Sequence, residues 1–217
     1  MVRLGLIGCA AFLACIQIAS AEQAPPERHL RGEVVAVSGS TVEMKTREGQ
    51  TERFTIGDTT RVSVASKSDL KRIDKNAYVG TTAVAQPDGT LRALEVHIFP
   101  EAARGAGEGH RPWDLQAGSS MTNATVSGVG QGGGSTMTNA TVSDATSSAR
   151  GMRMTLRYKD GEKTVVVPAG TTVVQLDPAD RSKLTPGARI FAAVKPSDGG
   201  ASVADRIVVG KDIAPPM

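Results

Sequence analysis

Apolar and polar residues alternate in short runs along most of the chain. In the run 41–46, Val42 and Met44 share one side, and the charged residues Glu43 and Lys45 share the other. Alternation with a period of two is the pattern of a β-strand that buries one face. Similar runs, separated by turns rich in Gly, Asp and Ser, cover 32–37, 51–56, 61–64, 79–85 and 91–99. The first half of the chain is therefore predicted to be a succession of β-strands.

The run 91–99 has two distinct faces. Val96 belongs to the apolar face together with Leu94 and Ile98, and it is expected to be buried. His97 lies on the opposite face, so its truncation to Ala is expected to cost little stability. The segment 68–73, which precedes the strands predicted over 79–85 and 91–99, is predicted to form a short helix or 3₁₀ turn.

The second half of the chain repeats this order of elements. Strands are predicted over 152–158, 164–167, 171–176, 188–195 and 203–209. A short helix is predicted between the third and fourth of them, with Asp177 as its cap and Pro178 at its first position. Turn residues and inward-facing apolar residues coincide between the halves, as where Gly49 aligns with Gly161. This coincidence indicates an internal duplication.

Five strands with a helix between the third and the fourth is the strand order of an OB-like barrel. We therefore predict an all-β protein of two small OB-like five-stranded barrels, each with one short helix, joined by a Gly/Ser/Thr-rich connector. The predicted parts are a signal peptide (1–21), a flexible lead-in (22–30), a first module (31–99), a connector with a duplicated segment (100–136), a second module (137–210) and a tail (211–217). His29, in the lead-in, is interpreted as a solvated residue.

The connector region contains the heptapeptide MTNATVS twice, at 121–127 and at 137–143. Either copy can supply the first strand of the second module. The copy at 137–143 leaves the shorter loop before the next strand, which favours it by about 1 kcal/mol or less. We predict that 137–143 fills the strand and that 121–127 is an added edge strand or mobile.

Two stretches carry a resemblance to a known family. The pattern G-x-V-x-x-V-x-G-x-x-V-x-M in Gly32–Met44 and the sequence GTLRALEV in Gly89–Val96 resemble domain of unknown function 5666. The resemblance covers 31–99 well and 137–210 weakly. It implies secreted bacterial modules with a small OB-like barrel, and it brings no catalytic residue to this chain.

The beginning of the chain has the layout of a secretory signal peptide. Arg3 precedes an apolar run and the small-residue sequence Ala-Ser-Ala at 19–21. The apolar run is shorter than the roughly 20 residues that a membrane span needs, so no span is expected. Cleavage after Ala21 would also remove both cysteines of the chain. The alternative is lipidation at Cys9 or Cys15, which both follow lipobox-like sequences.

Composition and motifs narrow the function. Basic residues (25) nearly balance acidic ones (22), and aromatic residues are 3% of the chain. Because OB folds that bind single strands stack bases on aromatic side chains along a basic groove, we expect no nucleic-acid binding. The chain contains no G-x-S-x-G, H-E-x-x-H or phosphate-binding loop. The sequence therefore predicts a non-enzymatic protein without a cofactor.

Two groups of residues are candidates for binding. His97, His110, Glu108 and Asp114 lie near one another in sequence and are of types that bind transition metals, although their spacing matches no known motif. Trp113, the one Trp of the chain, lies beside Arg111 and either packs against a barrel or offers a binding surface. We therefore predict an exported binding or scaffolding protein of the bacterial envelope, in the periplasm or secreted, whose partner is an envelope protein or a small ligand. The alternative is a periplasmic transition-metal-binding protein that uses His97 and His110.

Overall fold

β-Strands make up nearly all of the regular structure. The computed structural model describes residues 27–131, 151–197, 200–211, 213 and 215. Its strands are β1 (Arg28–Ser38), β2 (Thr41–Thr46), β3 (Thr51–Lys67), β4 (Tyr78–Ala85), β5 (Leu91–Ile98), β6 (Gly109–Pro112), β7 (Ser119–Gln131), β8 (Met152–Tyr158), β9 (Gly161–Val167), β10 (Thr172–Ala179), β11 (Arg189–Pro196) and β12 (Ser202–Gly210). The all-β prediction is confirmed. Among the described residues, no helix has the length and apolar character needed to cross a membrane.

Each expected helix is a 3₁₀ turn of three residues. The first, η1 (Leu70–Arg72), is capped by Asp69, whose side chain accepts a hydrogen bond from the Lys71 amide at 2.8 Å. The second, η3 (Arg181–Lys183), is capped in the same way by Asp180. The predicted start at Asp177 is wrong, because Asp177 and Pro178 still belong to β10 and pair with β3. A third turn, η2 (Glu101–Ala103), follows β5.

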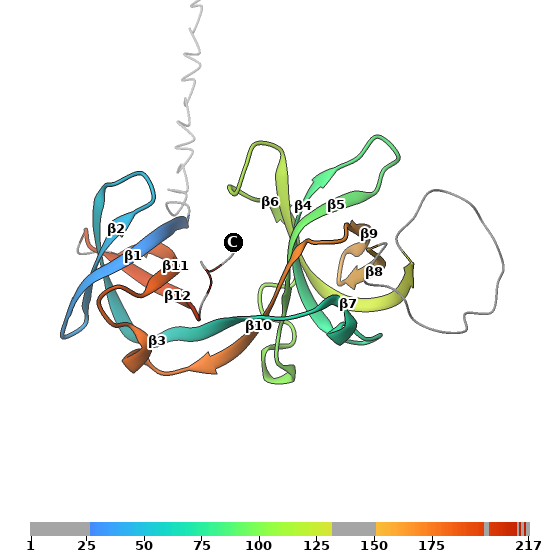
Figure 1. The fold of residues 1–217 in the computed structure, drawn as a ribbon. Helices are drawn as coiled ribbons and strands as arrows, with labels where there is room; N and C mark the ends of the chain where they lie inside the picture. Colours follow the sequence, from blue (N-terminus) through green and yellow to red (C-terminus); the bar gives the residue numbers. More distant parts are fainter. Residues whose placement is uncertain (1–26, 132–150, 198–199, 212, 214, 216–217) are drawn as a thin grey trace, which may run out of the picture.

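Five strands close into a barrel, which we call lobe A. β1 pairs with β2 and β11, β2 with β3, and β11 with β12. A parallel ladder between β12 and β3 completes the ring. Figure 1 shows lobe A on the left, with blue strands from the beginning of the chain beside red strands from its end.

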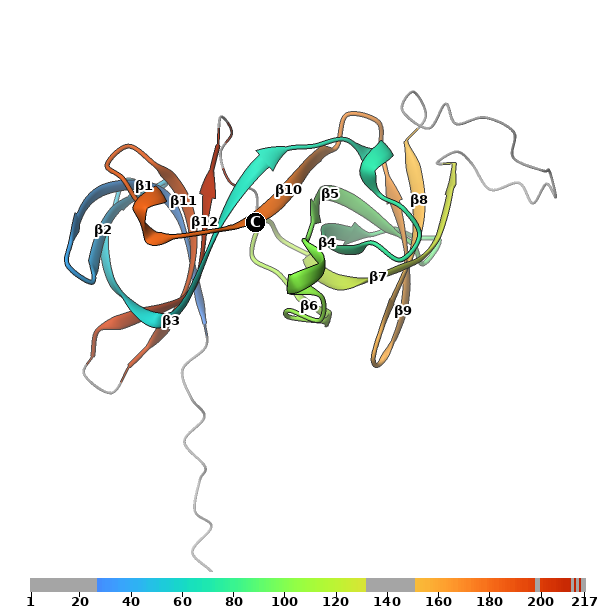
Figure 2. The same ribbon diagram turned by 90° about the horizontal axis from the view of Figure 1, so that it is seen from below.

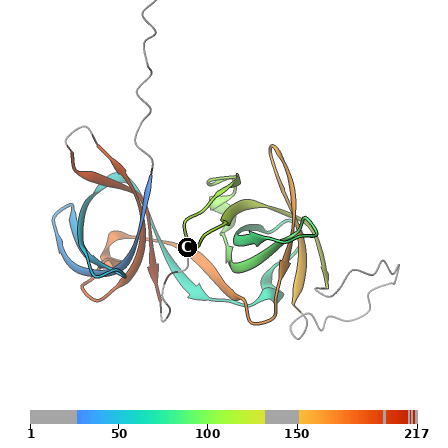
Figure 3. The ribbon, with the colours of Figure 1, turned by 90° about the horizontal axis from the view of Figure 1, so that it is seen from above.

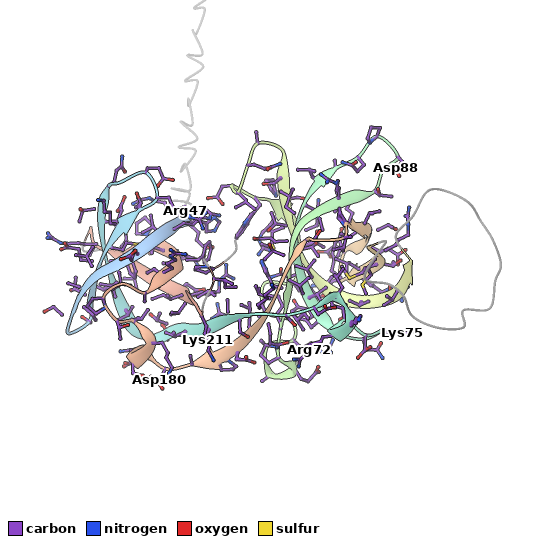
Figure 4. All side chains as sticks on the ribbon, in the orientation of Figure 1. Arg47, Arg72, Lys75, Asp88, Asp180 and Lys211 are labelled. Carbon is purple, nitrogen blue, oxygen red and sulfur yellow. The ribbon has the colours of Figure 1, made fainter. Side chains whose placement is uncertain are left out.

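The other strands form lobe B. β4 lies between β5 and β7, and β8 lies between β7 and β9. β5 also makes short parallel ladders with β9 and with the start of β10. The short strand β6 pairs with β7 and stands outside this order. Asp88 lies at the tip of the β4–β5 hairpin of lobe B (Figure 4).

The described strands of each predicted module, 31–99 and 137–210, do not close a barrel with one another. β4 and β5 leave the first three strands and join lobe B, while β11 and β12 take the equivalent place in lobe A. The mixed colours of each lobe in Figure 3 display this exchange. Its physical reason lies in β3, which continues for 17 residues instead of turning back after lobe A.

The two lobes are joined by an antiparallel ladder between β3 and β10. Residues Val62–Lys67 pair with Val174–Ala179, and the two strands run side by side between the lobes (Figure 2). Ala65 pairs with Leu176, and Val64 pairs with Asp177. Since Val64 and Leu176 occupy matching positions in the repeat, the exchange is close to two-fold symmetric.

The first copy of MTNATVS is a central strand of lobe B. Residues 121–127 lie in β7, which pairs with β4 on one side and β8 on the other. The prediction that 121–127 is an added edge strand or mobile is therefore wrong. The nearby strand β6 pairs with Ser120–Asn123 and holds this copy in place. This extra pairing outweighs the loop-closure preference for 137–143, which is about 1 kcal/mol or less. The second copy, 137–143, lies outside the described residues.

The apolar side chains form three clusters, one in each lobe and one between them. Phe54 is buried in lobe A, and Val96 in lobe B, as predicted. Leu94 is only partly buried, because a bulge opposite Thr82 and Ala83 turns it out of the core. The third cluster lies between the lobes and includes Ala65, Trp113, Met121, Val174, Leu176, Phe191, Ala193 and Val208.

Candidate functional site

The outer face of β5 is covered by lobe A, and polar side chains are buried there. Glu95 and His97 point away from the core of lobe B, as the alternation of β5 requires. Both are buried nevertheless, at 7% and 0% exposure. His97 does lie on the face opposite Val96, but that face is an interface between lobes, so His97 is buried instead of exposed.

Glu95, His97 and Thr82 are in contact within this interface. His97 Nε2 lies 3.2 Å from Glu95 Oε1, and the Thr82 hydroxyl donates a hydrogen bond to the same oxygen at 3.2 Å. The contact of His97 with Glu95 lacks hydrogen-bond geometry, and neither ring nitrogen of His97 has a hydrogen-bond partner among the described residues. An imidazole buried in this way has unused hydrogen-bonding capacity on both sides of its ring.

His97 lines a small, partly open space that we call the interlobe cavity. Its volume is about 10 Å³, and its walls come from β5, β6 and the loop after it, β7 and β12. The residues that line it are His97, Phe99, Arg111, Trp113, Met121, Asn123 and Arg206. Several of their buried polar atoms have no hydrogen-bond partner in the described structure: Trp113 Nε1, Arg206 Nε and Asn123 Oδ1.

An aromatic group from lobe A packs beside the cavity residue Trp113. Phe191 is fully buried, and two guanidinium groups approach its ring, with Arg31 Cζ at 5.4 Å and Arg206 Cζ at 5.6 Å from its centroid. The Trp113 ring lies 6.3 Å from that of Phe191, and Arg111 Cζ lies 5.4 Å from the Trp113 centroid. Cation–π contacts of this kind stabilise guanidinium groups that have lost part of their hydration.

A cluster of charged residues, which we call the rim, connects β1 of lobe A with the loop after β6. His29 lies between two carboxylates, with Nε2 at 3.2 Å from Glu27 Oε1 and Nδ1 at 3.0 Å from Asp114 Oδ1. Arg31 donates to both oxygens of Asp114, at 2.7 and 3.4 Å. The His29 ring also packs on Trp113, with 4.2 Å between centroids.

The rim lowers the pKa values of its carboxyl groups. The hydrogen bond from His29 is the main cause that holds the pKa of Glu27 below its ordinary value. Burial acts to raise the pKa of Asp114, but hydrogen bonds from Arg31 and His29 and their charges outweigh it and lower that pKa. Burial also lowers the pKa values of two basic residues near the rim, Arg111 and Arg206.

The lowered pKa of Asp114 predicts an acid-dependent loss of stability. Asp114 favours the folded state above its unfolded pKa of about 4, and this contribution is lost as the pH falls through its lower folded value. We expect the Asp114→Asn variant to be less stable than wild type at pH 7, with a difference that narrows below about pH 4. Urea midpoints measured between pH 7 and pH 2.5 check this, and a constant difference across that range would contradict it.

The four predicted metal ligands are not brought together. His97 is in the cavity and Asp114 in the rim, whereas His110 is exposed on β6 and bonds to the Thr122 hydroxyl at 2.8 Å. Glu108 accepts a hydrogen bond from the Lys159 amide at 2.9 Å. Within the described part of the chain, no group of three or more His, Cys, Asp or Glu side chains is arranged to hold a metal ion.

The predicted pair Arg111 and Trp113 does belong to the site. Trp113 is 8% exposed, so it packs between the lobes and also lines the cavity. Sequence reasoning missed the partners from distant segments, above all Phe191 and Arg206. It also interpreted His29 as solvated, although its side chain is 12% exposed. His29 directly precedes the buried Leu30, and this alternation could have extended the predicted first strand to include His29.

A larger groove lies on the outside of lobe A. Its volume is about 540 Å³, and Lys45, Arg47 and Arg189 are among the residues that line it. No buried unpartnered polar atom lies on its walls in the described structure. The interlobe cavity is therefore the stronger candidate site, although it is far smaller.

Fold and cavity together define an all-β protein with a polar cavity between two lobes of exchanged strands. No protein-family model matches the chain, and searches of curated proteins and of solved structures also find no match. The resemblance to domain of unknown function 5666 stays a prediction.

Proposed function

We propose that this chain is an exported, non-enzymatic binding protein of the bacterial envelope, which holds a small polar ligand between its lobes. Lobes A and B are, in this proposal, the two OB-like barrels expected from the repeat. The signal-peptide layout of the first 21 residues and the family resemblance support export. Both parts of the proposal are testable separately.

The observation that carries ligand binding is the concentration of unpartnered polar atoms around one cavity. Trp113 Nε1, Arg206 Nε, Asn123 Oδ1 and both nitrogens of His97 are buried there without hydrogen bonds. Each such group costs about 1–3 kcal/mol, and buried polar groups in proteins are nearly always satisfied. A ligand that accepts and donates hydrogen bonds in the cavity would remove this cost.

The alternative of transition-metal binding through His97 and His110 has less support. His97 is enclosed between the lobes beside Glu95, while His110 is exposed on β6 and bonded to Thr122. A transition-metal site needs its ligands within about 2.3 Å of one ion. Titration with Ni²⁺, Cu²⁺ and Zn²⁺ in a calorimeter tests this alternative directly.

Ligand binding can be tested with a variant that removes a single donor. Trp113→Phe keeps an aromatic ring but removes the indole N–H, and Lys75→Gln, at an exposed position, serves as the control. We expect native mass spectrometry or thermal shifts with a panel of small polar solutes to identify a ligand whose affinity falls about 5- to 100-fold in Trp113→Phe, the range expected for one buried hydrogen bond. No ligand for wild type, or equal losses in both variants, would contradict the proposal.

Export is tested on the protein isolated from the cell envelope. Its N-terminus is expected at Glu22 by mass spectrometry. A mature protein that begins at Met1, or that carries lipid on Cys9 or Cys15, would overturn this part and leave the test of ligand binding untouched.

A further inference from the structure

The size of the interlobe cavity limits what can occupy it. A volume of about 10 Å³ has room for one water molecule or one monatomic ion. Larger organic ligands would require the lobes to separate, and the β3–β10 ladder and the Arg31–Asp114 pair both oppose separation. The cavity as it stands therefore fits a single small species.

The chemistry of the walls favours an occupant that accepts hydrogen bonds. The Trp113 indole and the Arg206 guanidinium carry N–H donors and no acceptor. Both present an unpartnered, buried nitrogen: Nε1 of Trp113, which is 8% exposed as a residue, and Nε of Arg206. A second guanidinium, that of Arg111, also lines the cavity. Asn123 Oδ1 is an unpartnered acceptor on the same wall, so the donors outnumber it.

Charge distinguishes an anion from water. The cations around the cavity and rim are Arg31, Arg111, Arg206 and Lys195, and the carboxylates are Glu27, Glu95 and Asp114. Arg61 and Asp205, which are also near Arg206, pair with each other at 2.6 Å and cancel. The carboxylates belong to the rim and to Glu95, whereas the described wall of the cavity contains the guanidinium groups of Arg111 and Arg206 and no carboxylate.

Two guanidinium groups on one cavity wall repel each other within the folded protein. Burial lowers the pKa values of Arg111 and Arg206, the charge of Arg111 lowers that of Arg206 further, and the charge of Glu27 partly opposes both effects. A monovalent anion between the two guanidinium groups would offset their repulsion and accept the free N–H donors at once. Water would accept the hydrogen bonds and leave the charge in place.

We infer that the interlobe cavity binds one monovalent, monatomic inorganic anion of the size of chloride, held by Arg206, Arg111 and the Trp113 indole N–H. This inference deepens the proposed function and rests on it, because it names the class of ligand for the same site. The glycine at position 80 lets Asn123 and His97 keep their places beside the cavity, since a Cβ there would lie 2.7 Å from Asn123 Oδ1 and 3.3 Å from His97 Nδ1.

Bromide provides the decisive probe, because it replaces chloride and scatters anomalously. Crystals of the mature protein grown or soaked with NaBr are expected to show an anomalous peak in the cavity, between Arg206 and Trp113. In solution at constant ionic strength, replacing sodium gluconate by NaCl or NaBr is expected to raise the denaturation midpoint by about 5–10 °C once the halide reaches a hundred times its Kd.

Matched variants locate the effect. Trp113→Phe and Arg206→Gln are expected to lose the halide-dependent shift, whereas Arg72→Gln, which removes a charge from the exposed turn η1, is expected to keep it. If a cavity variant does not fold, the bromide peak in the wild-type crystal still decides.

Each outcome has a distinct meaning. No peak and equal midpoints in all sodium salts would overturn the anion and assign the cavity to water. If an organic solute then binds in a Trp113-dependent manner, the proposed function stands without the anion. If no solute binds, both fail.

Discussion

Val96→Asp is expected to prevent the protein from folding. Val96 is 0% exposed in the core of lobe B, where it pairs with Thr81 on β4 and Val173 on β10. A carboxylate there would be buried without a partner, at a cost that approaches or exceeds the roughly 5–15 kcal/mol by which proteins are stable. Far-UV circular dichroism and urea denaturation of the purified variant check the prediction.

Arg92→Asp is the matched control for that variant. It introduces the same side chain into the same strand at an exposed position, where a substitution changes stability by about 0.5 kcal/mol or less. If Val96→Asp unfolds cooperatively, with the same urea midpoint as Arg92→Asp, Val96 does not face the core.

Phe54→Ala is expected to lower the free energy of unfolding by about 3–5 kcal/mol. Phe54 is 1% exposed in lobe A, so truncation leaves a cavity that the closed barrel cannot collapse to fill. Val35→Ala, at a position 48% exposed on β1, is the control and is expected to change stability little.

The same variant also tests whether the lobes unfold together. Because β3 of lobe A pairs with β10, and β10 also pairs with β5 of lobe B, loss of lobe A should release β10 and weaken lobe B. Trp113 reports on the interface by its fluorescence, and circular dichroism reports on both lobes. We expect the two signals to shift together in Phe54→Ala, and separate transitions would contradict this coupling.

The local structure could be predicted from the sequence, because it depends on neighbours along the chain. Alternation placed Phe54 and Val96 in cores, and the repeat indicated the order of strands in each half. The partner of each strand could not be predicted in the same way. The repeat makes β4–β5 and β11–β12 similar, so either pair satisfies the hydrogen bonds of lobe A, and the sequence carries no local signal that separates the two arrangements.

The candidate site depends on that unpredicted choice. His97 looked exposed because alternation distinguishes the two faces of a strand and cannot show that a second lobe covers the outer face. Arg111 and Trp113 were found as neighbours in sequence. Phe191 and Arg206 come to them only because β11 and β12 return to the strands at the beginning of the chain.

The strand exchange also affects how fast the chain can fold. The Thr60 hydroxyl donates to the carbonyl of Ala204, 144 residues further along the chain, and many contacts of lobe A have similar separations. Folding slows as the separation of contacting residues increases. Until β12 arrives, β3 keeps an unpaired edge that another molecule's β12 can fill equally well, because the pairing surfaces are identical. Refolding at high protein concentration should therefore yield dimers in which two chains share their last strands, and dilution should favour the monomer.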